Sequence, residues 1–161
     1  MAGPTRHLAR IFVLLFVALV VARPEGATAS DALGKEDRAA IRRVIEAQIE
    51  ALRRDDASEA FSYAAPAVRE LFGTPERFFE MVKNMYAPLY RPRSVTFLEL
   101  ERIAGEHTQK VVVVGSDGAP RLALYLMARQ PDGSWKILGC VLRPFPLEVV
   151  QELPRAKRRR G

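Results

Sequence analysis

The fold is decided by residues 110–143, which read KVVVVGSDGAPRLALYLMARQPDGSWKILGCVLR. This stretch holds three apolar runs, and glycine-containing turns at residues 117–118 and 131–133 separate them. Connections this short join antiparallel strands, because parallel neighbours need a crossover of about a dozen residues or more. A fourth run of the same kind precedes the stretch. The sequence therefore predicts a four-stranded antiparallel meander over residues 94–103, 110–114, 121–129 and 135–143.

The first predicted strand changes its apolar parity part-way along. Val95 and Phe97 share one parity, whereas Leu98 and Leu100 share the other. A slip of this kind is what a β-bulge leaves in a sequence, and bulged strands bend. We therefore expect a curved sheet.

The other three strands are apolar on both parities. In residues 121–129, the residues Leu122, Leu124 and Leu126 alternate with Ala123, Tyr125 and Met127. In an antiparallel sheet with one solvent-exposed face, apolar and polar residues would alternate along each strand instead. Another segment must therefore cover the outer face. Two alternatives remain: the C-terminal segment 144–150 folds back over it, or a second copy of the chain covers it in a homodimer.

Helical periodicity precedes the sheet. Between Glu36 and Arg54, apolar residues recur at spacings of three and four, which is typical of an amphipathic helix. Asp56 and Glu59 have the spacing of a capping signal for a second, short helix, and Pro66 begins another turn.

A further helix is predicted after Gly73. This glycine stops the preceding turn, Thr74 supplies an N-cap hydroxyl, and Pro75 occupies the first helical position. The residues expected on its buried face are Phe78, Phe79, Val82, Met85 and Tyr86. Helices grouped before strands predict an α+β fold, with the N-terminal helices packed on one face of the sheet.

Residues 1–29 have the order of a signal peptide. Arg6 and Arg10 precede the apolar run 11–22, which is shorter than the roughly 20 residues of a membrane span. Small residues end the segment, so we expect cleavage near Ala29 and a periplasmic or secreted protein, with an uncleaved anchor as the alternative. The chain then divides into a signal peptide (1–29), a single domain (30–150) and a disordered basic tail (151–161).

The formal net charge of +6 belongs to the two ends of the chain. Residues 1–29 carry +2 and residues 155–161 carry +5, which leaves −1 for the body between them. Nucleic-acid binding needs a basic folded face, so we expect no nucleic-acid partner. The basic tail is expected to solubilise the protein or to touch an anionic membrane surface.

Four segments resemble an uncharacterised family of small exported bacterial proteins. They are residues 54–61 (RDDASEAF), 72–78 (FGTPERF), 86–93 (YAPLYRPR) and 135–140 (WKILGC). The resemblance extends over about residues 35–143. It implies an architecture similar to the NTF2-like, cystatin-like cone, in which a curved sheet and a long helix enclose a pocket. That superfamily includes enzymes and plain binding modules, so the resemblance implies no particular activity.

Aromatic residues are the candidates for lining such a pocket, because a tyrosine combines an apolar body with a polar tip. The predicted ligand-binding residues are Tyr63, Phe79, Tyr86, Tyr90 and Arg91, and Tyr125 belongs to the same aromatic set. The alternative is that the rings fill the core and that Arg91 is a solvated linker charge.

Few other residues are candidates for catalysis or metal binding. Cys140 has no histidine near it in the sequence and is predicted to be structural and buried. His107 is expected in the turn between the first two strands. With two histidines and one cysteine in the chain, we predict no catalytic residue, metal or cofactor.

Three functions fit these features. The leading hypothesis is a noncatalytic exported module that binds a small apolar or amphipathic ligand, or a protein partner. The alternatives are a small isomerase- or hydrolase-type enzyme using tyrosine and carboxylates such as Glu99 and Glu101, and a structural dimer whose cone is filled by its own side chains.

Overall fold

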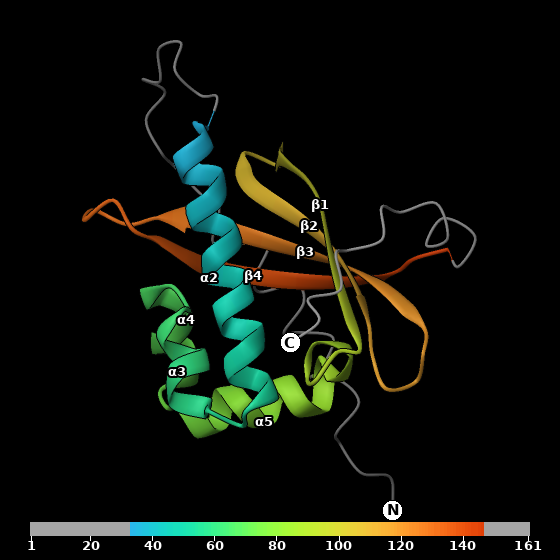
Figure 1. Ribbon diagram of the computed structural model, residues 1–161. Coiled ribbons are helices and arrows are strands. Elements are labelled where there is room, and N and C mark those ends of the chain that lie inside the picture. The colour runs from blue at the N-terminus through green and yellow to red at the C-terminus, as the bar shows by residue number, and fades with distance from the viewer. Residues whose placement is uncertain (1–32, 147–161) are drawn as a thin grey trace, which may run out of the picture. The chain divides into compact units, whose positions relative to one another are not determined.

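Helices precede strands along the chain, as predicted. The computed structural model describes residues 33–146, so the predicted signal peptide and basic tail lie outside the described residues. Its elements are α2 (Lys35–Arg53), α3 (Ala57–Ser62), α4 (Pro66–Phe72), α5 (Pro75–Met85), the 3-10 helix η1 (Ala87–Leu89), β1 (Ser94–Ile103), β2 (Glu106–Val114), β3 (Pro120–Arg129) and β4 (Trp135–Pro144) (Figure 1).

The four strands form one curved, open antiparallel sheet in the order β1-β2-β3-β4, which is the predicted meander. The register of β1 on β2 shifts between Phe97 and Leu100, so the predicted bulge is confirmed. β2 begins at Glu106 rather than at Lys110. The earlier start escaped prediction because residues 106–109 pair through their backbones while carrying polar side chains.

α2 lies across one face of the sheet, which we call the inner face (Figure 1). Ile41 and Ile45 are completely buried and Ile49 is 3% exposed, so one stripe of the helix faces the strands. They share a core with the inner-face side chains Val111, Val113, Ala123, Tyr125, Met127, Trp135 and Ile137. The fold is therefore α+β with helices packed on one face of the sheet.

The short helices and the C-terminal end of α2 form a second apolar cluster. Phe78 is its centre, with the ring centroids of Phe61 and Phe72 at 5.4 and 5.6 Å. Met85 was predicted to be buried here, and this prediction was wrong, since Met85 is 56% exposed. The reason is that α5 ends at Met85 and the chain turns into η1, so that Tyr86 packs inward instead.

The caps predicted from the sequence are present. Asp56 Oδ1 accepts a hydrogen bond from the backbone N–H of Glu59 at 2.9 Å, and Thr74 Oγ1 accepts one from Arg77 at 3.4 Å. Gly73 ends α4 with a φ of +73°, a left-handed conformation that glycine adopts without strain.

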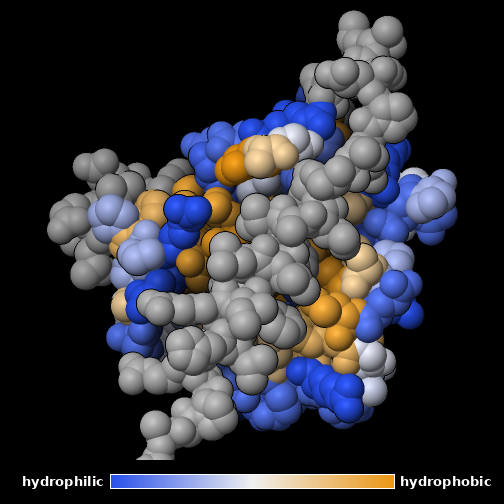
Figure 2. Space-filling model, turned by 180° about the vertical axis from the view of Figure 1, so that it is seen from behind, coloured by the Kyte–Doolittle hydropathy of each residue, from blue (hydrophilic) through white to orange (hydrophobic). Residues whose placement is uncertain are grey.

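The opposite side of the sheet, which we call the outer face, is also apolar. In the register, Val112 pairs with Leu122 and Leu124 pairs with Val141. The apolar side chains that alternate with the inner-face set are Val112, Leu122, Leu124, Leu126, Leu138 and Val141. Figure 2, which views this side, shows hydrophobic side chains gathered between charged margins.

Candidate functional site

The predicted ligand-binding residues do not gather at one place. Phe79 and Tyr90 belong to the second apolar cluster, whereas Tyr63 packs against the core under α2. Tyr86 contacts both clusters. The predicted residues therefore do not form one site.

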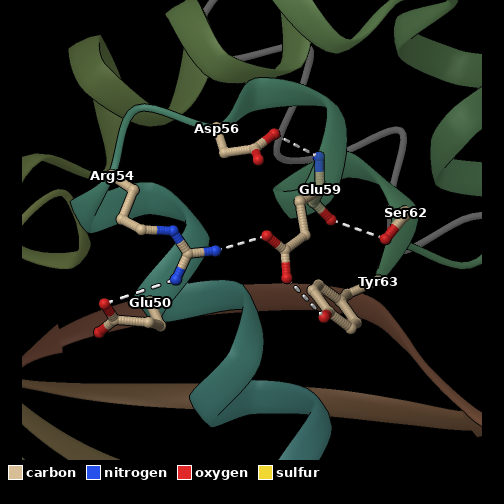
Figure 3. A network of polar contacts seen from close by, with 6 residues as sticks. All are labelled: Glu50, Arg54, Asp56, Glu59, Ser62 and Tyr63. Carbon is tan, nitrogen blue, oxygen red and sulfur yellow. Dashed lines mark hydrogen bonds and ion pairs between the residues drawn. The ribbon is translucent and has the colours of Figure 1, made fainter.

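Tyr63 lies in a polar network around the start of α3 (Figure 3). Its hydroxyl donates to Glu59 Oε1 at 3.1 Å, and Arg54 Nη2 donates to Glu59 Oε2 at 2.5 Å. Arg54 Nη1 also lies 3.5 Å from Glu50 Oε1. Burial, together with the hydrogen bond to Glu59, raises the pKa of Tyr63. The network joins α2 to α3, and its polar groups are already paired with one another.

Phe79, Tyr90 and Arg91 meet beside Asp55. The Tyr90 hydroxyl donates to Asp55 Oδ1 at 2.5 Å, and the Arg91 guanidinium forms an ion pair with Asp55 Oδ2. The rings of Phe79 and Tyr90 meet edge-on, with their centroids 5.8 Å apart. The hydrogen bond from Tyr90 is the main cause that lowers the pKa of Asp55, and Arg91 adds to it. The carboxylate is thus occupied by two neighbours of its own chain.

The hydroxyl of Tyr125 is buried in the core under α2. The residue lies on the inner face of β3 and is 1% exposed, and its Oη has no hydrogen-bond partner among residues 33–146. An unsatisfied polar group in an apolar core costs about 1–3 kcal/mol. Burial raises the pKa of Tyr125 well above its ordinary value, so the phenol keeps its proton and can donate as well as accept.

Tyr86 and Cys140 flank this phenol. Cys140 is the register partner of Tyr125 on β4, and the Tyr86 hydroxyl donates to the Cys140 carbonyl oxygen at 2.9 Å. Burial raises the pKa of the Cys140 thiol far above its ordinary value, although the residue as a whole is half-buried in an edge strand. A thiol in this environment supplies no thiolate near neutral pH, which fits a structural role.

Polar side chains gather where the first turns of α2 meet the sheet. The indole Nε1 of Trp135 donates to Asp37 Oδ1 at 3.0 Å, and Arg129 Nη2 lies 3.7 Å from the same oxygen. The ring of His107 meets that of Trp135 edge-on at 5.4 Å. Burial, followed by the charge of Arg102, lowers the pKa of His107, so its imidazole is neutral at pH 7. We call Asp37, His107, Arg129 and Trp135 the polar end of the contact between α2 and the sheet; the Arg129 side chain there is 58% exposed.

This polar end was not predicted from the sequence. His107 was expected in a turn, and this was wrong, because β2 begins one residue before it and places it in a strand beside Arg102. Asp37 lies 98 positions from Trp135, so the pair leaves no local pattern. The available signal was the single tryptophan at the start of a predicted strand, since a buried indole N–H requires an acceptor.

The carboxylates that an isomerase-type site would use do not face the tyrosines. Glu101 Oε1 lies 2.6 Å from Lys110 Nζ, and Glu99 is exposed. Within the described part of the chain, the buried polar residues are Gln48, Thr108 and Gln109, none of which is an acid.

Among residues 33–146, no group of three or more His, Cys, Asp or Glu side chains is placed to hold a metal ion. None of the helices in that range is long and apolar enough to cross a membrane.

The fold and its interior define an α+β protein in which helices pack on one face of a curved antiparallel sheet. Residues 34–148 match the family described as domain of unknown function DUF4864, and the chain belongs to this family. The predicted resemblance to an uncharacterised family is thereby confirmed. A comparison with curated proteins finds no match.

Proposed function

We propose that the protein is a noncatalytic binding module that takes a small apolar or amphipathic ligand between α2 and the inner face of the sheet. The observation that carries this proposal is the buried hydroxyl of Tyr125, which has no hydrogen-bond partner within the described part of the chain. A carbonyl, hydroxyl or carboxyl group on the ligand would complete its hydrogen bonding. No charged residue is buried beside it among the described residues, so the part of the ligand next to that group is expected to be apolar.

The surroundings of Tyr125 support a ligand with an apolar body. Ile41 and Ile45 of α2 and Met127 of β3 contribute apolar surface to the same core, and Tyr86 adds an aromatic ring. Such lining with few polar groups is typical of small-molecule sites. A second polar group on an amphipathic ligand, beyond the one that bonds to Tyr125, would suit the polar end, with Asp37, Arg129 and His107.

A hydrogen bond from the ligand to Tyr125 should strengthen binding measurably. Supplying a partner to an unsatisfied buried hydroxyl recovers about 1–3 kcal/mol, and each 1.4 kcal/mol changes a dissociation constant tenfold. A ligand that bonds to Tyr125 should therefore bind about tenfold or more tightly than the same ligand without that bond.

The proposal is tested by thermal-shift screening and a hydroxyl deletion. Decanoate, cholate and phenylacetate serve as probes, since each combines an apolar body with a carboxylate. We expect at least one of them to raise the Tm of the wild-type protein, and Tyr125→Phe to reduce the affinity for that probe about tenfold. Tyr125→Phe without a probe should keep or raise the Tm, because it removes an unsatisfied polar group.

Tyr90→Phe is the matched control. It removes one hydroxyl from a tyrosine outside the core under α2, and the affinity for the probe should stay unchanged. If no probe raises the Tm and Tyr125→Phe melts several degrees lower than wild type, then the interior is filled by its own side chains and the binding proposal is wrong.

We further propose that this module acts outside the cytoplasm, in the periplasm or after secretion. The support is the order of basic, apolar and small residues in the segment 1–29. The basic residues 155–160 at the other end would then be available to an anionic membrane surface, each contributing about 1 kcal/mol near it.

A further inference from the structure

The outer face of the sheet is an apolar feature that the proposed function leaves unexplained. The helices of the described chain lie on the inner side (Figure 1), and the outer face presents apolar side chains from β2, β3 and β4 (Figure 2). Val141, near its margin, is 44% exposed. A contiguous apolar surface of this kind marks a docking site.

We propose that residues 147–153 of the same chain, LEVVQEL, pack on this outer face. The segment follows directly on the described residues. β4 ends at Pro144, which pairs with Arg121 of β3, so the chain leaves the sheet at the margin of the apolar surface. The next residue, Phe145, is half-buried.

The segment is long enough to reach the central strands. From β4 to β2 there are two strand spacings, about 10 Å in all. Seven residues cover about 23 Å when extended and about 10 Å when helical. Residues 147–153 therefore reach β2 in either conformation.

The composition of the segment matches the surface. Leu147, Val149, Val150 and Leu153 are apolar, whereas the residues from Pro154 onward are mainly basic and have no apolar pattern. Residues 147–153 therefore have the composition to cover the apolar outer face, whereas the basic tail beyond them does not.

The charges are complementary as well. The segment contains Glu148 and Glu152 and no basic residue. Arg143, opposite Leu122 in the register, has no ion-pair partner among residues 33–146. A glutamate of the segment would supply that partner at the margin of the apolar face.

Tethering favours the segment over a second copy of the chain. A short linker gives the segment an effective concentration in the millimolar range, and its docking loses none of the translational freedom that two separate molecules lose on association. A homodimer through the outer face is therefore an outcome of the test rather than the proposal.

Photocrosslinking of the full chain identifies the occupant. With p-benzoylphenylalanine replacing Leu124, near the middle of the outer face, we expect a crosslink of monomeric mass that joins position 124 to residues 147–153. The same probe at the exposed Ala67 on α4 should give no crosslink to that segment. A crosslink between two copies, a crosslink to residues 11–22, or no crosslink at all would each overturn the proposal.

A pair of deletions provides a second, independent measurement. Removing residues 147–161 should increase the fluorescence of the apolar dye ANS several-fold and promote self-association in analytical ultracentrifugation, because it uncovers the outer face. Removing only residues 154–161 should leave both readouts at the wild-type level. If the longer deletion behaves as the wild type does, the segment does not cover the face.

Discussion

Asp55 and Arg91 both have left-handed backbone conformations, with φ of 59° and 57°, and their side chains form an ion pair with each other. Left-handed φ values are uncommon for residues other than glycine and cost free energy. Asp55 lies in the turn between α2 and α3, and Arg91 lies in the connection from η1 to β1. The ion pair therefore holds two strained connections against each other, and each helps to fix the conformation of the other.

Replacing this carboxylate should lower stability in a pH-dependent manner. Asparagine tolerates the left-handed conformation, so Asp55→Asn removes the charge with little added strain. Because the pKa of Asp55 is lowered in the folded protein, its contribution is present above the unfolded-state value of about 3.9 and is lost as the pH falls through the folded value. We expect the Tm of Asp55→Asn to be a few degrees below wild type at pH 7, and this difference to shrink below about pH 4. Glu70→Gln, at an exposed position on α4, should show no such difference.

The strand order and the helix caps were predictable because their signals are local. The turn glycines in residues 115–133 divide the apolar runs, and Asp56 and Thr74 cap helices that begin at the next residue. The bulge in β1 was predictable for the same reason, since the slip between Phe97 and Leu100 shows in the alternation itself. Elements whose determinants lie within a few residues of one another can be derived from one sequence.

The contacts that form the candidate site were not predictable in this way. Tyr90 bonds to Asp55 across 35 positions and Tyr86 bonds to Cys140 across 54. The sequence marked Tyr125 as one aromatic residue among several. That its hydroxyl lacks a partner among residues 33–146 depends on the side chains that surround it in three dimensions, and no local pattern encodes this.

Removing the hydroxyl of Tyr86 should destabilise the protein. Tyr86→Phe leaves the Cys140 carbonyl oxygen without that donor, and a hydrogen bond of this kind contributes about 0.5–1.5 kcal/mol. Urea unfolding should show a lower midpoint with an unchanged m-value. The Tyr63 hydroxyl bonds to the partly exposed Glu59, so Tyr63→Phe should lower the stability less than Tyr86→Phe does. A larger loss of stability in Tyr63→Phe would contradict the buried, stabilising hydrogen bond assigned to Tyr86.

The thiol of Cys140 should be inert in the folded protein. Burial raises its pKa, so the thiolate that reacts with disulfide reagents is scarce at pH 8. We expect labelling by DTNB to be slow in the native state and to become fast in urea. Ser116→Cys in the Cys140→Ala background supplies an exposed comparison that labels rapidly without urea. Native labelling of Cys140 as fast as that of the exposed thiol would exclude burial.

The proposed export predicts a defined N-terminus for the mature protein. Cleavage after Ala29 should give a chain that begins at Ser30 in the periplasmic or culture-medium fraction, as measured by intact-mass spectrometry. Ala29→Arg, which places a large charged residue at the expected cleavage site, should leave an uncleaved precursor. A membrane-bound wild-type form that retains Met1 or Ala2 would instead support an anchor.

The hydrogen bond between Trp135 and Asp37 should connect the start of α2 to the sheet. Asp37→Ala leaves the N–H of an indole that is 3% exposed without its acceptor and removes the carboxylate that lies 3.7 Å from Arg129. Losing a hydrogen bond to a charged acceptor costs about 1.5–3 kcal/mol, so the midpoint of urea unfolding should fall accordingly. Trp135 is the only tryptophan of the chain, and its emission therefore reports on this site directly. We expect the emission of Asp37→Ala to move to longer wavelength, because water gains access to the indole N–H.

Glu36→Ala, at the neighbouring exposed position on the same helix turn, is the control and should change neither the emission nor the midpoint of urea unfolding appreciably. Unchanged emission in Asp37→Ala would mean that the first turn of α2 is held by its apolar contacts alone.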